Sequence, residues 1–138
     1  MTIKQFKIFK NKRVIVTGHT GFKGSWLALW LTKLNAKVLG ISKNIPTKPS
    51  HFDAINLKKK IIDVRADIKN FVKLNKIITD YKPDFIFHLA AQSLVTKSYL
   101  NPIDTFETNV LGTVNLLQSV RNLKKKCVVI LITSDKSY

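Results

Sequence analysis

The stretch Thr17-Gly18-His19-Thr20-Gly21-Phe22-Lys23-Gly24 decides the fold of this chain. Residues 13–17, which lead into the glycines, are β-branched apart from Arg13, and this predicts a buried strand. Residues 21–34, which follow, carry apolar side chains at helical spacing and predict a helix. A glycine-rich turn between a strand and a helix is typical of a site where the helix N-terminus binds the pyrophosphate of a dinucleotide.

The three glycines have separate uses in such a turn. Gly18 permits the tight turn, Gly21 lets the backbone approach the pyrophosphate, and Gly24 lets the helix pack against the strand. Phe22 lies at the start of the expected helix, directly after Gly21, and we expect it to contact the cofactor. Lys23 either contacts a phosphate or is a solvated helix residue. The alternative for the whole stretch is a turn whose glycines are only structural.

Short apolar runs alternate with stretches of helical spacing along the rest of the chain. Further strands are expected at residues 38–41, 61–64, 84–89 and 127–133, and further helices at residues 71–81 and 101–123. Residues 45–56 contain Pro46 and Pro49 and are expected to be irregular. Apolar strands that alternate with helices predict a parallel sheet covered on both faces. We therefore expect a Rossmann-like, doubly wound α/β sheet, forming one dinucleotide-binding domain over residues 1–138.

The net charge of +16 could suggest a polyanionic partner, but its composition argues otherwise. The charge comes almost entirely from lysines scattered along the sequence, and the only arginines are Arg13, Arg65 and Arg121. Arginine is the residue that reads phosphates and bases bidentately, and no zinc-finger spacing or aromatic-basic stacking platform is visible. We expect a solvated lysine surface, or one that attracts an anionic nucleotide-sugar. Neither a nucleic acid, a membrane nor a metal ion is an expected partner.

The compartment follows from what the sequence does not contain. No apolar run reaches the roughly 18 residues of a membrane span, and residues 1–12 lack the apolar stretch of a secretory signal. The single cysteine, Cys127, lies in an apolar run, where we expect it to be a buried strand residue. One cysteine cannot form an intramolecular disulfide. The expected location is a reducing cytoplasm.

Three further segments, together with the glycine turn, form a set of motifs. They are Ala66-Asp67-Ile68 after the third expected strand, His88-Leu89-Ala90-Ala91-Gln92 after the fourth, and Glu107-Thr108-Asn109-Val110-Leu111-Gly112-Thr113 in the last helix. Together these segments resemble the extended short-chain dehydrogenase/reductase family. The resemblance implies that Asp67 and Ile68 lie beside the adenine of the cofactor. It also implies that the backbone at Leu89, Ala90 and Ala91 approaches the cofactor.

Some of these residues have a structural alternative. Asp67 could be a helix N-cap, or could serve both as a cap and as an adenine ligand. His88 alone is more often a packed histidine at a strand end than a catalyst. Asn109 is intrinsically unfavourable in the middle of a helix, which fits a structural or active-site role near the cofactor.

The end of the second expected strand bears on the choice of cofactor. It reads Ile41-Ser42-Lys43, without the acidic residue that binds the ribose 2′-hydroxyl of NAD in many dehydrogenases. On physical grounds Ser42 and Lys43 tolerate a 2′-phosphate and therefore NADP. The resemblance implies NAD. We expect NAD, with Ser42 beside the ribose, and NADP stays an alternative.

Within the family, the chain is most similar to the CDP-glucose 4,6-dehydratases. The similarity rests on the glycine turn, on residues 46–50 and 92–102, and on Thr133-Ser134-Asp135-Lys136-Ser137-Tyr138. These dehydratases pass a hydride from sugar C4 to NAD, eliminate water across C5 and C6, and return the hydride to C6. By resemblance, Ser134 hydrogen-bonds the sugar and Asp135 protonates the departing hydroxyl. Lys136 is then either a base with a depressed pKa or an electrostatic stabiliser of the enolate.

The sequence also departs from the family. The Tyr-x-x-x-Lys pair that supplies the oxidising base is absent. We therefore expect an N-terminal fragment, with a sheet truncated after about the fifth strand, no substrate domain, and no activity alone. The full-length form is expected to be a homodimer that uses helix 101–123. The alternatives are another nucleotide-sugar epimerase or reductase, and a non-catalytic dinucleotide-binding module.

Overall fold

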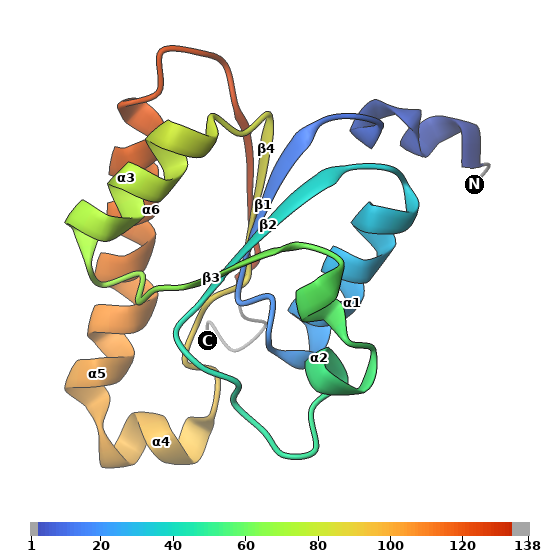
Figure 1. Ribbon diagram of the computed structural model, residues 1–138. Helices are drawn as coiled ribbons and strands as arrows, with labels where there is room; N and C mark the ends of the chain where they lie inside the picture. The colour runs from blue at the N-terminus through green and yellow to red at the C-terminus, as the bar shows by residue number, and fades with distance from the viewer. Residues whose placement is uncertain (1–2, 134–138) are drawn as a thin grey trace.

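The structure, a computed structural model, describes residues 3–133, with side chains from Phe6 onward (Figure 1). Its centre is a five-stranded parallel sheet in the order β3-β2-β1-β4-β5. The strands are β1 (Arg13–Thr17), β2 (Lys37–Ser42), β3 (Ile62–Arg65), β4 (Phe85–His88) and β5 (Val128–Leu131). The Rossmann-like, doubly wound sheet predicted from the sequence is thereby confirmed.

Helices cover both faces of this sheet (Figure 1). One face carries α1 (Phe22–Lys33) and α2 (His51–Ala54), and the other carries α3 (Phe71–Tyr81) and α6 (Gly112–Arg121), which pack against each other. The helix that ends in α6 begins with α5 (Pro102–Phe106) and passes through a π-helical turn, η3 (Glu107–Leu111). The remaining elements are α4 (Val95–Leu100) and the 3-10 helices η1 (Ile3–Phe9) and η2 (Leu57–Lys59). Within residues 3–133, no helix is both long and apolar enough to cross a bilayer.

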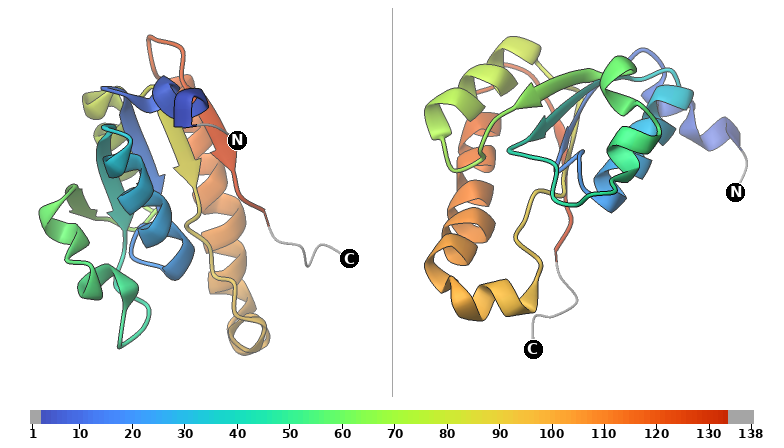
Figure 2. Two further views of the ribbon diagram at one scale, coloured as in Figure 1. Left: turned by 90° about the vertical axis from the view of Figure 1, so that its right-hand side faces the viewer. Right: turned by 60° about the horizontal axis from the view of Figure 1, so that its bottom comes forward.

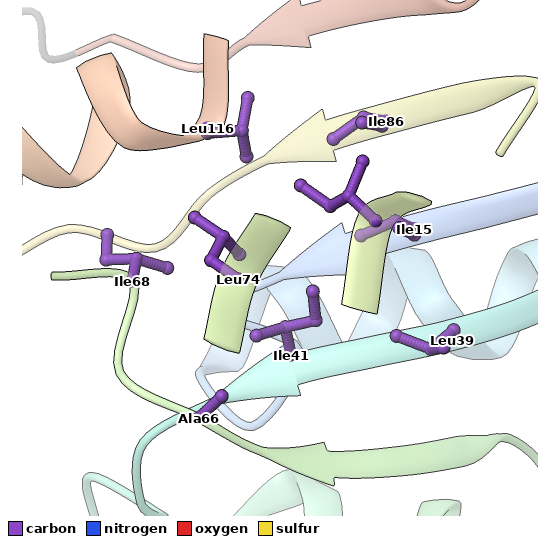
Figure 3. Close-up of a cluster of buried hydrophobic side chains, with 9 residues drawn as sticks. Ile15, Leu39, Ile41, Ala66, Ile68, Leu74, Ile86 and Leu116 are labelled. Atoms are coloured by element: carbon purple, nitrogen blue, oxygen red, sulfur yellow. The ribbon is translucent and has the colours of Figure 1, made fainter. Parts of the chain in front are cut away.

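Alternating side chains along β1 build a separate core on each face of the sheet. Ile15 lies in one core with Leu74 of α3 and Leu116 of α6 (Figure 3). Val14 and Val16 lie in the other core, under α1 and α2. All five side chains are fully buried. Because β1 is buried on both faces, its sequence is a continuous apolar run.

Three details differ from the sequence predictions. The segment 45–56, predicted to be irregular, contains α2, which Ser50 caps by accepting the Asp53 N–H at 3.1 Å. The helix predicted over 101–123 is interrupted by the π-helical turn η3. Cys127 is only half-buried and lies just before β5, so its prediction as a buried strand residue was wrong. The reason is that β5 is an edge strand, whose first residue, Val128, is 52% exposed.

Candidate functional site

The five strands run in one direction, so the turns that follow them meet at one edge of the sheet (Figure 2). We call it the carboxyl edge. The chain leaves β1 toward α1 on one face and reaches β4 from α3 on the other, so the strand order reverses between β1 and β4. Ligands of such sheets bind outside the carboxyl ends of the strands at this reversal. The cofactor residues predicted from the sequence lie in these turns, at the end of β2, in the first turn of α1, or in η3.

Gly18 and Gly24 shape the glycine turn itself. Gly18 has a φ of 74°, and a Cβ there would lie 2.9 Å from the Ala90 nitrogen and from the Leu89 carbonyl. Its N–H donates to the Ile41 carbonyl of β2 at 2.8 Å. A Cβ at Gly24 would collide with the Gly18 backbone, because α1 starts directly against the turn. Both positions therefore require glycine for the fold.

Gly21 differs from the other two glycines because little surrounds the place of its missing side chain. Its N–H donates to the Gly18 carbonyl at 3.0 Å, and among residues 3–133 an added Cβ would meet only that oxygen, at 3.3 Å. Among the described residues, no side chain caps α1. The first N–H groups of the helix are therefore available to an anion. Phe22 and Lys23 are both exposed, so both interpretations of Lys23 stay open.

His19 holds the turn from inside, a role that sequence reasoning missed. Its ring is buried against Gly40, where a Cβ would collide with it, and its Nε2 lies 2.8 Å from Asp63 Oδ1. A carboxylate only accepts, so Nε2 donates to it, and Nδ1 accepts from Ser42 Oγ at 3.1 Å. Ser42 Oγ itself accepts from the Thr20 N–H at 3.4 Å. Burial lowers the pKa of His19 despite the nearby carboxylate, which keeps the ring neutral.

These hydrogen bonds limit which groups of Ser42 can contact a ligand. Its side chain is buried and its hydroxyl is held by His19 and Thr20, so a contact with the ribose depends on its backbone. A contact between the Ser42 backbone and the cofactor stays a prediction. The sequence contained one signal for the burial of His19. A histidine inside the glycine turn needs the space that Gly40 leaves in the neighbouring strand.

Asp67 does not cap a helix. Its Oδ1 accepts from the Lys69 N–H at 2.9 Å, and its Oδ2 lies 3.0 Å from Lys43 Nζ. Asn70 caps α3 by accepting the Lys73 N–H at 3.0 Å, so the helix-cap interpretation of Asp67 was wrong. Burial raises the pKa of Asp67, but the Lys69 N–H and the Lys43 ammonium more than offset it, and the pKa lies below its usual value. The adenine contact stays a prediction.

The loop after β3 is tied to the helices on its own face of the sheet. The buried side chain of Ile68 lies against Gly112 of α6, so only its backbone can approach a cofactor (Figure 3). Lys69 Nζ lies 2.6 Å from Asp104 Oδ1 and 3.1 Å from Glu107 Oε2. These hydrogen bonds raise the pKa of Lys69, which therefore stays charged. The ion pairs fix the loop that carries Asp67.

The loop after β4 begins on the side chain of Thr17. The Leu89 and Ala90 N–H groups both donate to Thr17 Oγ1 at 3.1 Å. This places the backbone of both residues directly over Gly18, in agreement with the close approach described above. Ala91 follows and is exposed. The glycine turn and the β4 loop are thus packed and hydrogen-bonded together, although the cofactor contacts of Leu89, Ala90 and Ala91 stay predictions.

Asn109 anchors the far end of the same loop. Its Oδ1 accepts from the Gln92 N–H at 2.7 Å, and its Nδ2 donates to the Gln92 carbonyl at 2.9 Å. It lies in the π-helical turn η3, a local widening of the kind often found in helices at functional sites. The amide therefore positions the loop through Gln92, which explains an asparagine in mid-helix. A direct contact of Asn109 with the cofactor stays a prediction.

His88 is a packed histidine at a strand end, and its ring lies between Thr17 and Thr113. Thr113 donates its single hydroxyl proton to the Asn109 carbonyl at 2.7 Å, so it accepts from His88 Nε2 at 3.1 Å. His88 Nδ1 therefore accepts from the Thr17 hydroxyl at 2.7 Å. Burial lowers the pKa of His88 to about 4, so the ring is neutral at physiological pH. The structural interpretation of His88 is confirmed.

Acidification is expected to weaken the fold through His88. Its folded pKa of about 4 lies below the ordinary value of 6.5, so the unfolded chain binds the proton more tightly. This stabilisation is complete above about pH 6.5 and is lost as the pH falls toward 4. The difference between these two pKa values corresponds to about 3 kcal/mol in the free energy of unfolding. Urea unfolding at several pH values between these limits should show the loss.

His88→Asn is the matched variant for this experiment, because asparagine does not titrate. It should remove most of the pH dependence, leaving the smaller part due to His19, whose pKa is also lowered. An equally steep dependence in the variant would contradict the assignment of His88 as a buried, neutral histidine.

Three predicted residues cannot be placed in this site. Ser134, Asp135 and Lys136 lie outside the described residues, so their roles stay predictions. Within residues 3–133, no group of three histidine, cysteine, aspartate or glutamate side chains lies together in a way that could hold a metal ion.

The sequence model of the GDP-mannose 4,6 dehydratase family matches residues 15–138. A CDP-glucose 4,6-dehydratase of Salmonella typhimurium is 49% identical over 94% of this chain and 36% of its own length. A CDP-paratose 2-epimerase of Salmonella typhi is 34% identical over 91% of this chain and 38% of its own length. The chain thus spans little more than a third of the length of these relatives.

Solved structures of epimerases share the fold. The epimerase Mth375 of Methanothermobacter thermautotrophicus has a TM-score of 0.82 at 27% identity, over 96% of this chain and 38% of its own. The UDP-glucose 4-epimerase of Thermus thermophilus, solved in complex with NAD, has a TM-score of 0.70 at 30% identity, over 79% of this chain and 33% of its own. The resemblance inferred from the sequence motifs is confirmed. Since the family's sequence model matches nearly the whole chain, the chain belongs to the GDP-mannose 4,6 dehydratase family.

Proposed function

We propose that this chain is the cofactor-binding part of a CDP-glucose 4,6-dehydratase, which converts CDP-glucose to CDP-4-keto-6-deoxyglucose and water. The observation that carries the proposal is the 49% identity to the Salmonella typhimurium dehydratase, against 34% to the epimerase relative. The triad Ser134-Asp135-Lys136 supports it, because it resembles the corresponding segment of CDP-glucose dehydratases. The single cysteine supports a location in the reducing cytoplasm.

NAD fits the carboxyl edge of the sheet. Gly21 leaves room above the glycine turn, and the uncapped first turn of α1 offers N–H groups to the pyrophosphate. When bound, NAD would accept a hydride from the sugar and return it. Asp67 and the β4 loop, fixed by Lys69 and Asn109, would hold the adenosine and orient the rest of the cofactor. The described residues thus bind and position rather than react.

The surroundings of Lys43 favour NAD over NADP. Its ammonium already lies 3.0 Å from Asp67 Oδ2. A 2′-phosphate placed beside Lys43 would also lie close to this carboxylate, and like charges a few ångströms apart repel. The 2′-hydroxyl of NAD meets no such repulsion. The ion pair therefore weakens the tolerance for a 2′-phosphate that the sequence suggested.

The elimination step belongs in this proposal to the residues that follow β5 in the sequence. Asp135 would protonate the departing C6 hydroxyl, and Ser134 would hydrogen-bond the sugar. Lys136 would act at C5, as a base or as the charge that stabilises the enolate. These roles rest on the resemblance of Ser134-Asp135-Lys136 to the dehydratase segment.

A homodimer is proposed for the whole enzyme, through an apolar seam on the helix that runs from α5 to α6. The seam consists of five exposed side chains at spacings of three or four residues: Ile103, Phe106, Val110, Val114 and Leu117. This spacing places them on one face of the helix. A continuous apolar stripe on a water-soluble surface marks a place for association. A second copy offers the same stripe, so the contact is self-complementary.

Val114→Asp is expected to disrupt this dimer, because it places a charge in the middle of the seam. Val72→Asp on α3 is the matched control, since Val72 is 77% exposed and lies outside the seam. Sedimentation of the full-length protein should give a monomer for Val114→Asp and a dimer for Val72→Asp. A dimer in both variants would place the interface elsewhere.

The proposed function can be tested by exchanging parts between relatives. This chain would replace the matching N-terminal part of the Salmonella typhimurium dehydratase, and the chimera would be mixed with NAD and CDP-glucose. We expect the 4-keto-6-deoxy product at a rate typical of enzymes, about 1 s⁻¹ or more. A chimera that folds and binds both ligands but forms no such product would overturn the proposal. The same exchange into the CDP-paratose 2-epimerase should not support epimerisation.

A further inference from the structure

The amino edge of the sheet, opposite to the cofactor site, is strongly cationic. Counting the first residue of each strand and the four residues before it, the chain has one acidic residue there, Asp84, and twelve basic ones. The basic residues are all exposed: Lys10, Lys12, Arg13, Lys33, Lys37, Lys58, Lys59, Lys60, Lys82, Lys124, Lys125 and Lys126. The lysines looked scattered along the sequence, but most of the net charge of +16 gathers at this edge.

The parallel topology explains this gathering. Every strand of a parallel sheet starts at the same edge, so the segments that lead into β1, β2, β3, β4 and β5 become neighbours in space. Two surface hollows show the result. One brings Lys12 and Lys126 together where β1, β4 and β5 start, and the other brings Lys37 and Lys60 together where β2 and β3 start.

The carboxyl edge does not share this excess. The last residue of each of the first four strands and the four residues after it contain three basic residues, Lys43, Arg65 and Lys69, and one acidic residue, Asp67. Each of the three cations also lies within 3.1 Å of a carboxylate oxygen. The positive field of the protein therefore points away from the predicted cofactor site.

The charges of the amino edge are almost uncompensated. Among the described residues, the only ion pair there is Lys125 Nζ with Asp84 Oδ1, at 2.7 Å. Arg13 donates to the Tyr81 carbonyl, which carries no net charge. Such a concentration of one sign opposes the compact state by self-repulsion, and binding a surface of opposite charge relieves that repulsion.

Apolar side chains lie among these lysines. Ile8, Ile62 and Val128 are each more than half exposed, and each lines one of the two hollows. The edge has few of the features that read nucleic acids, because eleven of its twelve cations are lysines and no aromatic side chain among its described residues is exposed. A surface of lysines with aliphatic side chains between them matches the headgroup region of an anionic bilayer.

The sequence alone led us to expect no membrane partner, but the clustering of the lysines in the fold changes that expectation. We propose that the amino edge docks the protein on an anionic lipid surface. The lysines attract the phosphates of the headgroups, and Ile8, Ile62 and Val128 enter the shallow interfacial layer. The carboxyl edge then faces the water, where a soluble nucleotide-sugar reaches it. Each lysine near such a surface contributes about fivefold to the affinity, and salt screens this contribution.

The test is the partition of the purified chain onto lipid vesicles. Vesicles of phosphatidylcholine with about 30% phosphatidylglycerol should bind the chain in about 0.1 M salt and release it in about 1 M salt, and pure phosphatidylcholine vesicles should not bind it. The double variant Lys59→Gln/Lys60→Gln should bind the anionic vesicles about 25-fold more weakly. The control Lys48→Gln/Lys97→Gln loses the same charge away from the amino edge and should change binding by less than about threefold. Circular dichroism would establish that both variants keep the fold.

Three results would overturn the proposal. The first is equal binding to anionic and neutral vesicles, and the second is an equal loss of binding in the two double variants, which would reflect net charge alone. The third is binding of a short DNA duplex more tightly than the anionic vesicles at the same salt concentration, with the loss again confined to Lys59→Gln/Lys60→Gln. That last result would make a nucleic acid the partner of this edge.

Discussion

Replacing Gly21 with valine should abolish NAD binding to this chain while leaving the fold intact. Of the residues that the structure describes, a Cβ at position 21 would meet only the Gly18 oxygen, at 3.3 Å, and the backbone there is extended, as valine prefers. The two methyl groups would then occupy the space above the turn that the pyrophosphate needs. We expect the affinity to fall at least about a hundredfold, or about 2.7 kcal/mol.

Calorimetric titration with NAD measures this loss, and thermal unfolding measures the fold. Gly18→Val is the contrasting variant, because Gly18 has a φ of 74° and a Cβ there would press on the Leu89 carbonyl. Gly18→Val should therefore lower the melting temperature sharply, whereas Gly21→Val should not. Unchanged NAD affinity in a folded Gly21→Val variant would show that the pyrophosphate does not bind at this turn.

Replacing Asp135 with asparagine should separate the two halves of the dehydratase reaction. In the proposed mechanism Asp135 donates a proton only when the C6 hydroxyl departs, and asparagine cannot do so. Removing a positioned proton donor slows its step by about 10²–10⁴-fold. Oxidation of the sugar at C4 does not use this proton, so CDP-glucose should still reduce bound NAD.

The experiment uses the dehydratase chimera described above. Absorbance of the reduced nicotinamide follows the first half, and formation of the 4-keto-6-deoxy sugar follows the second. Asp80→Asn is the matched control, since Asp80 is exposed on α3 and forms an ion pair with Lys76, away from the carboxyl edge. The role given to Asp135 would be wrong if both halves slowed equally while NAD binding stayed intact.

Much of the fold could be predicted because its signals are local. The apolar run of β1, the glycine turn and the periodicity of residues 71–81 each lie within one short segment, and β1 and α3 begin and end as predicted. Asn109 could be singled out because an asparagine in mid-helix needs a reason. Its partner Gln92 lies 17 residues away in sequence, so the reason itself became visible only in three dimensions.

The features that sequence reasoning missed depend on contacts between distant segments. The buried hydrogen bond from His19 to Asp63 spans 44 residues. Gly40 in the neighbouring strand signals that the His19 ring is buried, but nothing near either residue identifies Asp63 as its partner. The cationic amino edge is different, because the sequence already contained the information needed to predict it. In a parallel sheet, the lysines that precede each strand must meet at one edge. The lysines look scattered only when their positions are compared along the sequence and not relative to the strands.

Amide chemical shifts of the ¹⁵N-labelled chain during titration with NAD test the central claim most directly, because they report which backbone groups meet the cofactor. We predict that the largest changes fall at residues 18–24, with smaller ones at residues 66–68 and 89–92 on the same edge. Changes confined to the lysines of the amino edge, such as Lys59 and Lys60, would mean that NAD is held there only as an anion. That result, or no change at about 1 mM NAD, would contradict the assignment of the glycine turn as the dinucleotide site.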